Sequence, residues 1–259
     1  MAGIADSLRS IWKIDELRKR IIYTLSILVI YRVGAYVTLP GINATALTDA
    51  FAQGDPNNLF GFFNLFVGGA FLQAGVFALG IMPHITASII IQLLGAAVPY
   101  FQKLQREGEE GRRKITQLTR YGTAGITALQ SIGYSLFLWG TVPQAIVIQQ
   151  TLFIVTTVIV LTAGTMFVMW LGERITESGI GNGISLIITI GIIAFLPQAF
   201  VNEVRQSANI FLVVFEIGVL VVVTAFVVLM TQGTRRIPVQ YAKRVVGRKV
   251  YGGTTLYLP

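Results

Sequence analysis

Few residues in this chain have the types and spacing that catalysis or metal binding requires. The sequence contains one histidine, His84, and no cysteine, which excludes disulfides, cysteine-based zinc sites and thiol nucleophiles. An intramembrane serine protease would need a serine and a histidine that meet within the membrane. His84 directly follows Pro83 in an apolar run and has no acid paired with it. We therefore predict that the protein is not an enzyme, uses no metal or other cofactor, and packs His84 or turns it toward a cavity.

A second candidate for chemistry is the glycine-rich motif GIGNG at residues 179–183. A dinucleotide-binding loop of this kind follows a β-strand and is itself followed by an acidic residue. This motif follows a long apolar run instead. We therefore predict a tight cytoplasmic turn between two membrane helices.

Two ionisable residues, Arg32 and Glu216, lie inside apolar runs. A charge at the centre of a membrane helix costs about 2.5–3.5 kcal/mol on insertion scales, so each needs a physical reason. Arg32 is near the end of its run and is expected to reach the membrane surface. Glu216 has no obvious partner of the kind that a proton-coupled transporter has at the midplane. A protonated or surface-reaching carboxyl is expected there.

The composition is that of a membrane protein. Hydrophobic residues make up 54% of the chain, charged residues make up 12%, and the mean hydropathy is +0.69, whereas soluble proteins are about 25% charged. We predict an all-α membrane protein, a polytopic helical bundle with about six spans, each near the ~20 residues that a bilayer requires. The predicted spans are residues 21–39, 76–98, 121–139, 152–171, 184–201 and 210–231.

The distribution of basic residues orients these spans. With the N-terminus in the cytoplasm, the segments inside the cell hold 18 of the 20 Lys and Arg residues, as the positive-inside rule requires. These segments are an amphipathic surface helix at 1–20, a basic loop at 103–120, a loop at 172–183 and a basic docking loop at 232–259. Residues 40–75 then lie outside, and the protein is predicted to be a multi-pass protein of the cell inner (plasma) membrane.

One uncharged stretch, residues 59–102, is too long for one crossing. Two crossings would put the next basic loop outside, against the positive-inside rule. We therefore predict one crossing at 76–98, preceded by an apolar half-helix at about 62–74. The half-helix either lies flat on the outer surface or re-enters the membrane inside a cavity, where non-spanning backbone is tolerated. Gly68 and Gly69 suit the bend that re-entry needs.

Five long segments of the sequence form a recognisable series. In chain order they are FNLFVGGAF (63–71), FALGIMPHITASIIIQLL (77–94), REGEEGRRKITQLTRYGT (106–123), GTMFVMWLGERITESGIGNGIS (164–185) and RRIPVQYAKR (235–244). Together they resemble the SecY family, whose members are the central subunit of the bacterial Sec protein-conducting channel. The resemblance implies a SecY-like inverted-repeat architecture with an incomplete second half. It also implies that the C-terminal half of the same protein, in a longer product or a second chain, is a partner.

The same resemblance implies a function and its residues. It implies a channel that translocates secretory polypeptides across the membrane and releases membrane proteins laterally into it. The pore-ring positions are Ile81, Ile85, Ile184 and Ile188. The plug positions are Phe62, Asn64, Val67, Gly68 and Gly69. The lateral-gate positions are Thr86, Ser88 and Gln92, although contacts between packed helices explain these polar residues equally well.

The basic cytoplasmic loops are predicted docking surfaces, because a basic patch attracts acidic partners and nucleic acid. In the resembled family, the last of these loops binds the SecA motor or a translating ribosome with its ribosomal RNA. The other implied partners are SecE-like and SecG-like small membrane subunits, signal sequences, nascent polypeptides and the lipid bilayer. The predicted docking residues are Arg112, Arg113, Arg235, Arg236, Lys243, Arg244, Arg248 and Lys249.

A secondary transporter with a re-entrant helix is the alternative function. Such a transporter would bind a small solute or couple to an ion gradient. A channel of the resembled family would instead crosslink to a signal sequence.

Overall fold

The computed structural model describes residues 13–52, 59–206 and 210–233 and four short strands near the C-terminus. The chain divides into two compact units, residues 1–197 and 198–259. The helices are α2 (Asp15–Ala35), α3 (Ala44–Ala52), α4 (Leu59–Phe66), α5 (Met82–Ala97), α6 (Pro99–Arg106), α7 (Glu109–Thr141), α8 (Gln150–Ser178), α9 (Gly183–Ile193), α10 (Leu196–Gln206) and α11 (Ile210–Gln232). A 3₁₀ helix, η1 (Pro143–Ala145), joins α7 to α8, and the strands are β1 (Ile237–Gln240), β2 (Arg244–Val246), β3 (Lys249–Tyr251) and β4 (Thr255–Leu258).

Local sequence signals explain where several helices begin. Pro83 lies in the first turn of α5, where its missing N–H costs nothing. The Asn182 side chain accepts a hydrogen bond from the Ser185 amide at 3.1 Å and thereby caps α9. Glu109 and Glu110 occupy the first turn of α7, where carboxylates interact favourably with the helix dipole.

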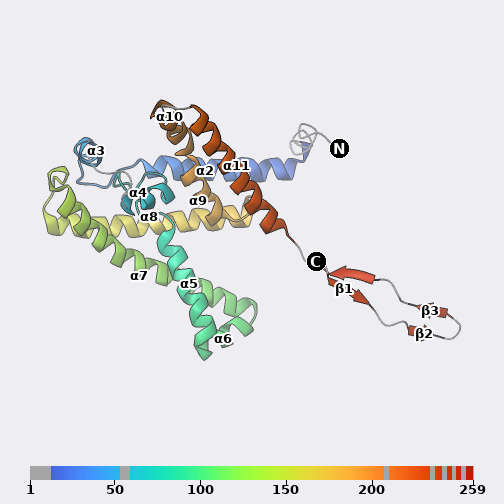
Figure 1. The fold of residues 1–259 in the computed structure, drawn as a ribbon. Coiled ribbons are helices and arrows are strands. Elements are labelled where there is room, and N and C mark those ends of the chain that lie inside the picture. The colour runs from blue at the N-terminus through green and yellow to red at the C-terminus, as the bar shows by residue number, and fades with distance from the viewer. Residues whose placement is uncertain are drawn as a thin grey trace. The chain divides into compact units, whose positions relative to one another are not determined.

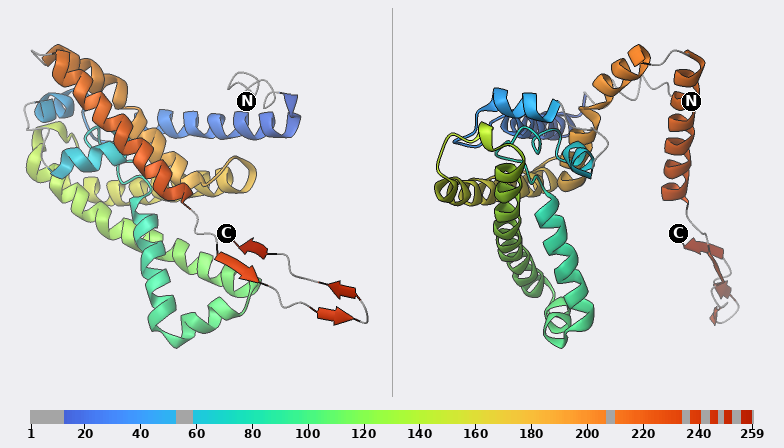
Figure 2. Two further views of the ribbon diagram at one scale, coloured as in Figure 1. Left: turned by 45° about the vertical axis from the view of Figure 1, so that its right-hand side comes forward. Right: turned by 60° about the vertical axis from the view of Figure 1, so that its left-hand side comes forward.

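The first unit is a bundle built on two long helices. α7 and α8 pack against each other as an antiparallel pair joined by η1 (Figure 1). α5 lies beside the first half of α7, and α6 turns back toward the start of α7 (Figure 2). α2 and α9 pack against α8 and against each other. The turn-rich segment 67–81, which links α4 to α5, is largely buried within this unit.

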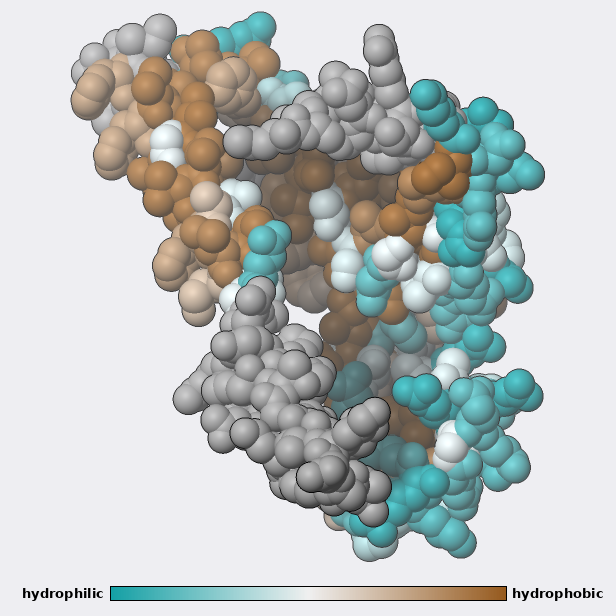
Figure 3. All heavy atoms as spheres, turned by 90° about the vertical axis from the view of Figure 1, so that its right-hand side faces the viewer, coloured by the Kyte–Doolittle hydropathy of each residue, from teal (hydrophilic) through white to brown (hydrophobic). Residues whose placement is uncertain are grey.

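The surface of the protein is strongly apolar, as expected for a chain that contacts lipid. Large side chains such as Leu129 and Phe211 are 72% and 75% exposed. On the face drawn in Figure 3, hydrophobic residues form broad continuous areas and hydrophilic residues gather in separate ones. Apolar areas of this extent are rare on soluble monomers.

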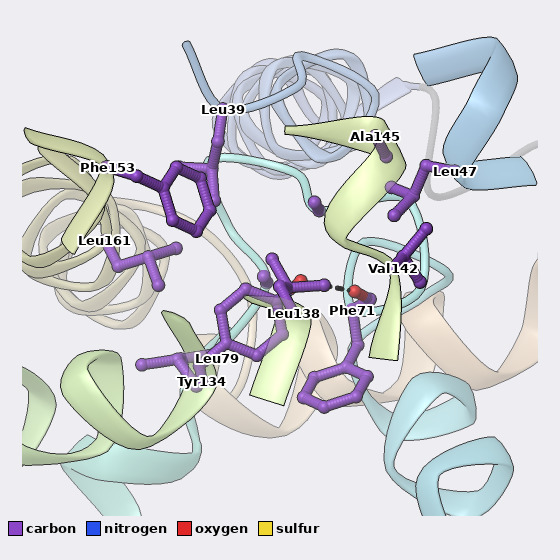
Figure 4. Packing of buried hydrophobic residues seen from close by; sticks show 12 residues of the cluster. Leu39, Leu47, Phe71, Leu79, Tyr134, Leu138, Val142, Ala145, Phe153 and Leu161 are labelled. Carbon is purple, nitrogen blue, oxygen red and sulfur yellow. Dashed lines mark hydrogen bonds between the residues drawn. The ribbon is translucent and has the colours of Figure 1, made fainter. Parts of the chain in front are cut away.

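Two main hydrophobic clusters form the core of the first unit, and a small third cluster contains Ala35, Val67 and Ala70. The larger contains Leu39, Leu47, Phe71, Leu79, Tyr134, Leu138, Val142, Phe153 and Leu161 (Figure 4). The second contains Ile27, Tyr31, Phe77, Ile81, Val168, Met169, Leu171, Ile175 and Ile187. Both clusters include residues of the 67–81 segment, so this segment is part of the core.

α7 contributes a hydroxyl stripe to this packing. Its members are Thr119, Thr123, Thr127, Ser131 and Ser135, which are all buried. Each hydroxyl donates to a carbonyl three or four residues earlier in α7, so the helix itself satisfies these groups. Small hydroxyl residues also allow membrane helices to approach closely.

Fewer helices pass a length and composition test for crossing a membrane than the six predicted spans. Among the described residues, three segments pass, and four pass if α5 and α6, which meet at a bend of 98°, count as one span. α7 contains many Gly, Ser and Thr residues, which lower its hydropathy, and α2 carries several charged residues within its 21 residues. The number of crossings therefore still rests on the charge pattern and stays a prediction.

The structure corrects two predicted helix boundaries. The half-helix at 62–74 is helical only as far as Phe66, and the helix within the predicted span 76–98 begins at Met82. The chain between them forms turns because Gly68 and Gly69 adopt positive φ. The predicted span 184–201 contains a turn between α9 and α10, but residues Gly183–Arg205 together pass the test for a membrane span. Within the predicted surface helix 1–20, residues 1–12 lie outside the described part of the chain.

The second unit ends in a β-structure that the sequence did not predict. β1 pairs antiparallel with β4, and β2 pairs antiparallel with β3. The two ladders are nested, since β2 and β3 lie between β1 and β4 along the chain (Figure 1). The predicted basic docking loop thus contains paired strands.

Candidate pore and plug site

The plug segment, residues 62–74, changes from helix to turns near its middle. Gly68 and Gly69 have φ values of +72° and +96°, which glycine adopts at no steric cost. The Asn64 side chain stabilises the turn, because its oxygen accepts a hydrogen bond from the Leu72 amide at 3.0 Å. The bend predicted at the two glycines is therefore present.

Two side chains of α2 bind the plug tip, which we define as Val67 and Gly68. Arg32 Nη1 donates to the Gly68 carbonyl at 2.6 Å, and the Tyr31 hydroxyl donates to the Val67 carbonyl at 3.4 Å. Arg32 also donates through Nη2 to the Tyr36 hydroxyl at 3.2 Å and lies 5.3 Å from the Tyr36 ring centroid. The guanidinium of Arg32 thus binds the plug tip, a contact that the sequence did not predict, and the expectation that Arg32 reaches the membrane surface stays a prediction.

The base of the plug segment is bound separately. The Tyr134 hydroxyl, on α7, donates to the Phe71 carbonyl at 2.6 Å, and the two rings lie 4.9 Å apart (Figure 4). Just beyond the segment, the Val76 amide donates to the Val37 carbonyl at 2.8 Å. Irregular backbone at membrane depth needs such partners because no water is available there.

A glycine on α9 allows the plug tip to approach closely. A Cβ atom placed on Gly191 would lie 3.0 Å from the Phe66 carbonyl oxygen and 3.3 Å from the Gly68 amide nitrogen. A Cβ atom on Gly68 would lie 3.2 Å from the Gly191 Cα. The two backbones therefore pack directly against each other.

The structure brings together most of the predicted plug residues. Val67 is only 1% exposed, and Asn64, Gly68 and Gly69 form the turn around it. The Phe62 side chain lies outside the described residues. Sequence reasoning missed the neighbours that bind this turn, namely Tyr31, Tyr134 and Gly191. The only sequence signal for a residue that binds this turn was the charge of Arg32 within an apolar run.

The four predicted pore-ring residues all lie in or beside the second hydrophobic cluster. Ile81 is 4% exposed and belongs to the second hydrophobic cluster, and Ile85, Ile184 and Ile188 are partly buried against the same cluster. The Ile85 amide donates to the Ile81 carbonyl at 3.2 Å, at the start of α5. The four residues thus share one hydrophobic cluster, although α5 and α9 do not pack directly against each other.

The predicted gate residues separate into two places on α5. Ser88 and Gln92 are hydrogen-bonded at 3.2 Å and line a cavity of about 260 Å³ with His84, Thr119 and Glu173. Thr86 does not line this cavity, and its exposed hydroxyl donates to a carbonyl of its own helix.

His84 faces this cavity from α5. Its Nδ1 lies 3.2 Å from the Thr123 hydroxyl. Glu173, at the opposite wall, accepts two hydrogen bonds from Arg120 at 3.1 and 2.7 Å. Within the described part of the chain, no cluster of three or more metal-binding side chains occurs. The arrangement is a polar contact between helices that faces a small cavity.

Comparison with known proteins identifies the family. The family model named SecY matches residues 75–259. The chain belongs to the SecY family. It is 45% identical over 250 residues to the protein translocase subunit SecY of Vibrio cholerae and 47% identical over 253 residues to that of Escherichia coli K12. Each alignment covers 95% of this chain but only 56% and 57% of the relative, so the chain spans little more than half of their length.

A solved structure shows the same fold. The chain resembles Sec61 in the canine ribosome–channel complex from the endoplasmic reticulum with a TM-score of 0.56 at 20% identity. The match covers 91% of this chain and 53% of that chain. The helical bundle with its buried turn is thus the fold of a SecY-type channel half.

The docking residues implied by SecY membership are only partly described. Arg112 and Arg113 are exposed near the start of α7. Arg244 lies in β2 opposite Tyr251, and Lys249 lies in β3 opposite Val246. The structure does not describe the remaining predicted docking residues, which are Arg235, Arg236, Lys243 and Arg248.

Proposed function

We propose that this chain forms part of a channel that moves secretory polypeptides across the inner membrane and releases membrane proteins laterally into it. The observation that carries this proposal is the buried turn within the plug segment, whose carbonyls accept hydrogen bonds from side chains of α2 and α7. A turn of this kind inside a helical membrane bundle suits a movable barrier. The names of its relatives as translocase subunits support the same function.

The proposed topology has about six crossings with the N-terminus in the cytoplasm. The positive-inside distribution of Lys and Arg supports it. In this orientation the plug segment enters from the outside, and the loops with Arg112, Arg113 and the basic hairpin strands face the cytoplasm.

The proposed seal is an aliphatic constriction beside the plug. Ile81, Ile85, Ile184 and Ile188 lie against one hydrophobic cluster, and a narrow apolar constriction excludes ions by dewetting. Such a ring opens for a polypeptide because its side chains deform. Ser88 and Gln92 then line part of a lateral gate on α5, through which signal sequences reach lipid.

Several partners follow from the proposal. Small SecE-like and SecG-like membrane subunits and the C-terminal half of the same protein would complete the shell around the pore. The SecA motor or a translating ribosome would dock on the basic cytoplasmic loops, where basic residues attract acidic protein surfaces and ribosomal RNA. The Sec61 relative, described in a ribosome–channel complex, supports ribosome docking. The role is non-catalytic, and family membership favours it over a secondary transporter.

Site-specific photocrosslinking tests the proposal. A photoreactive residue replaces Ile85 in the intact translocase, and a secretory chain is stalled during translocation. We expect a crosslink to the stalled chain at Ile85 and none at Ile159, a control position on α8 that is 63% exposed. Equal crosslinking at both positions, or none at Ile85, would contradict a pore beside this residue.

A further inference from the structure

We propose that Arg32, assisted by Tyr31, is the positioning residue that holds the plug tip in its closed place. This inference rests on the proposed function, because it assumes that the plug segment moves when the channel opens. The new element is a latch on α2, by which we mean the contacts that hold the plug tip in place until the channel opens. The latch consists of the two hydrogen bonds from Arg32 and Tyr31 to the Gly68 and Val67 carbonyls.

The Arg32 bond is the stronger part of the latch. At 2.6 Å it is a short, charge-assisted hydrogen bond, and such bonds are roughly twice as strong as neutral ones. None of the described ion pairs involves Arg32. Its charge is therefore compensated by the Gly68 carbonyl and by the Tyr36 hydroxyl and ring. If the plug tip moves away, the guanidinium loses its best acceptor in an apolar setting, which opposes opening.

The base of the plug segment has anchors that do not depend on Arg32. Tyr134 binds the Phe71 carbonyl, and the backbone of Val76 binds that of Val37. The tip contacts the two α2 side chains and Gly191, and Val67 packs in a small cluster with Ala35 and Ala70. Among the side-chain hydrogen bonds that the structure describes, those to the tip come from α2, so Arg32 is the polar anchor of the tip, whereas the base has anchors of its own.

Arg32 is also dispensable for the packing of α2 itself. Ile27 and Tyr31 attach α2 to the second hydrophobic cluster, where the Tyr31 ring stacks on Phe77 at 5.9 Å. The guanidinium touches the plug tip and Tyr36 instead. Removing it should therefore free the tip without detaching the helix.

The test measures how often the plug tip opens. The chain contains no cysteine, so Val67→Cys, at a position that is 1% exposed, gives a clean reporter for thiol labelling in membranes with the intact translocase. In this background we expect Arg32→Met to raise the resting labelling rate at least about tenfold, the effect of losing a charged hydrogen bond. Tyr31→Phe should raise it less, since its bond is longer, and Arg32→Lys, which keeps the charge and one donor, should partly restore protection.

Two controls separate a latch from general loosening. Arg18→Met makes the same substitution on the same helix, at an exposed residue paired with Asp15, and should leave labelling at 67 unchanged. A second reporter, Leu138→Cys, lies in the larger cluster at 1% exposure. Its labelling should not rise with Arg32→Met, whereas equal increases at both reporters would mean that Arg32 merely stabilises the fold and would overturn the latch.

The outcomes also distinguish the latch from the proposed function. If labelling at 67 in the otherwise unchanged protein does not rise when a secretory chain is translocated, the plug does not move and the proposed function fails. If it rises then, but Arg32→Met leaves the resting rate unchanged, only the latch is refuted. If the Arg32→Met protein does not accumulate, Arg32→Lys alone decides the question. The latch then requires Arg32→Lys to raise the resting labelling rate at position 67 by a smaller but measurable amount. An unchanged labelling rate would overturn the latch.

Discussion

The hydrogen bond from Tyr134 to the plug base makes a quantitative prediction about stability. Tyr134→Phe removes one hydroxyl from a side chain that is 4% exposed and leaves the ring in place. The bond it deletes, 2.6 Å to the Phe71 carbonyl, is the shorter of two that this carbonyl accepts, since the Ala74 amide also donates to it at 3.2 Å. The carbonyl then keeps only the longer of these two bonds.

The expected loss is about 0.5–1.5 kcal/mol, the net contribution of a typical hydrogen bond. Hydrogen bonds between membrane helices average about 0.6 and reach about 1.7 kcal/mol. The cost of a fully unsatisfied acceptor does not apply, because the Ala74 amide still donates to the Phe71 carbonyl. For a unit of about 200 residues this loss corresponds to a fall in Tm of roughly 1–6 °C.

Thermal unfolding in detergent measures the effect. Tyr100→Phe, at a tyrosine that is 61% exposed on α6, is the matched control and should shift the Tm by less than the error of the measurement. An unchanged Tm in Tyr134→Phe would refute the reasoning, since it would mean that the Tyr134 hydroxyl adds no stability beyond the bond that the Ala74 amide makes to the Phe71 carbonyl.

Two further predictions concern the seal. Replacing Ile81 and Ile188 together with glycine should remove the dewetted constriction and produce ion leak across vesicles that contain the intact translocase; unchanged conductance, compared with glycine at Ile159, would remove both residues from the pore. Deleting residues 62–74 should leave secretion viable but increase resting ion permeability, because the aliphatic ring remains while the plug is lost. Complete loss of secretion with normal accumulation of the protein would instead assign the segment a role in transport itself.

The overall helical architecture was accessible from sequence, but the plug turn was not. Continuous apolar runs in the sequence predicted the helices α8 and α11, and the charge pattern predicted the loops between the spans. Residues 59–98 carry no charge at all, so neither rule could detect that helix stops at Phe66 and resumes at Met82. Periodicity is uninformative when every face is apolar. The interruption depends on positive φ at Gly68 and Gly69 and on donors from helices that are distant in sequence.

Arg32 shows a second limit of sequence reasoning. Its position near the end of an apolar run fits a side chain that reaches the membrane surface as well as it fits one that binds the plug tip. Only the tertiary structure reveals the Gly68 carbonyl within 2.6 Å. The strands near the C-terminus were missed for a different reason. The basic residues there led us to predict a docking loop, and the strand pairing joins residues as distant in sequence as Ile237 and Leu258.

Many polar side chains in the first unit bind backbone at places where a helix is interrupted. Around the plug these are Tyr31, Arg32, Asn64 and Tyr134. At the GIGNG turn, Thr24 accepts from the Ile180 amide at 3.1 Å, and Thr176 accepts from the Gly183 amide at 2.9 Å.

This use of polar groups follows from the membrane environment, because irregular backbone has no water to bind and the few polar side chains must supply its partners. Ser88 and Gln92 do not follow this pattern, since they bind each other beside a cavity on an unbroken helix. They give this face of α5 a polar lining beside a cavity, which is the feature that fits the proposed gate, although contacts between packed helices also explain such residues.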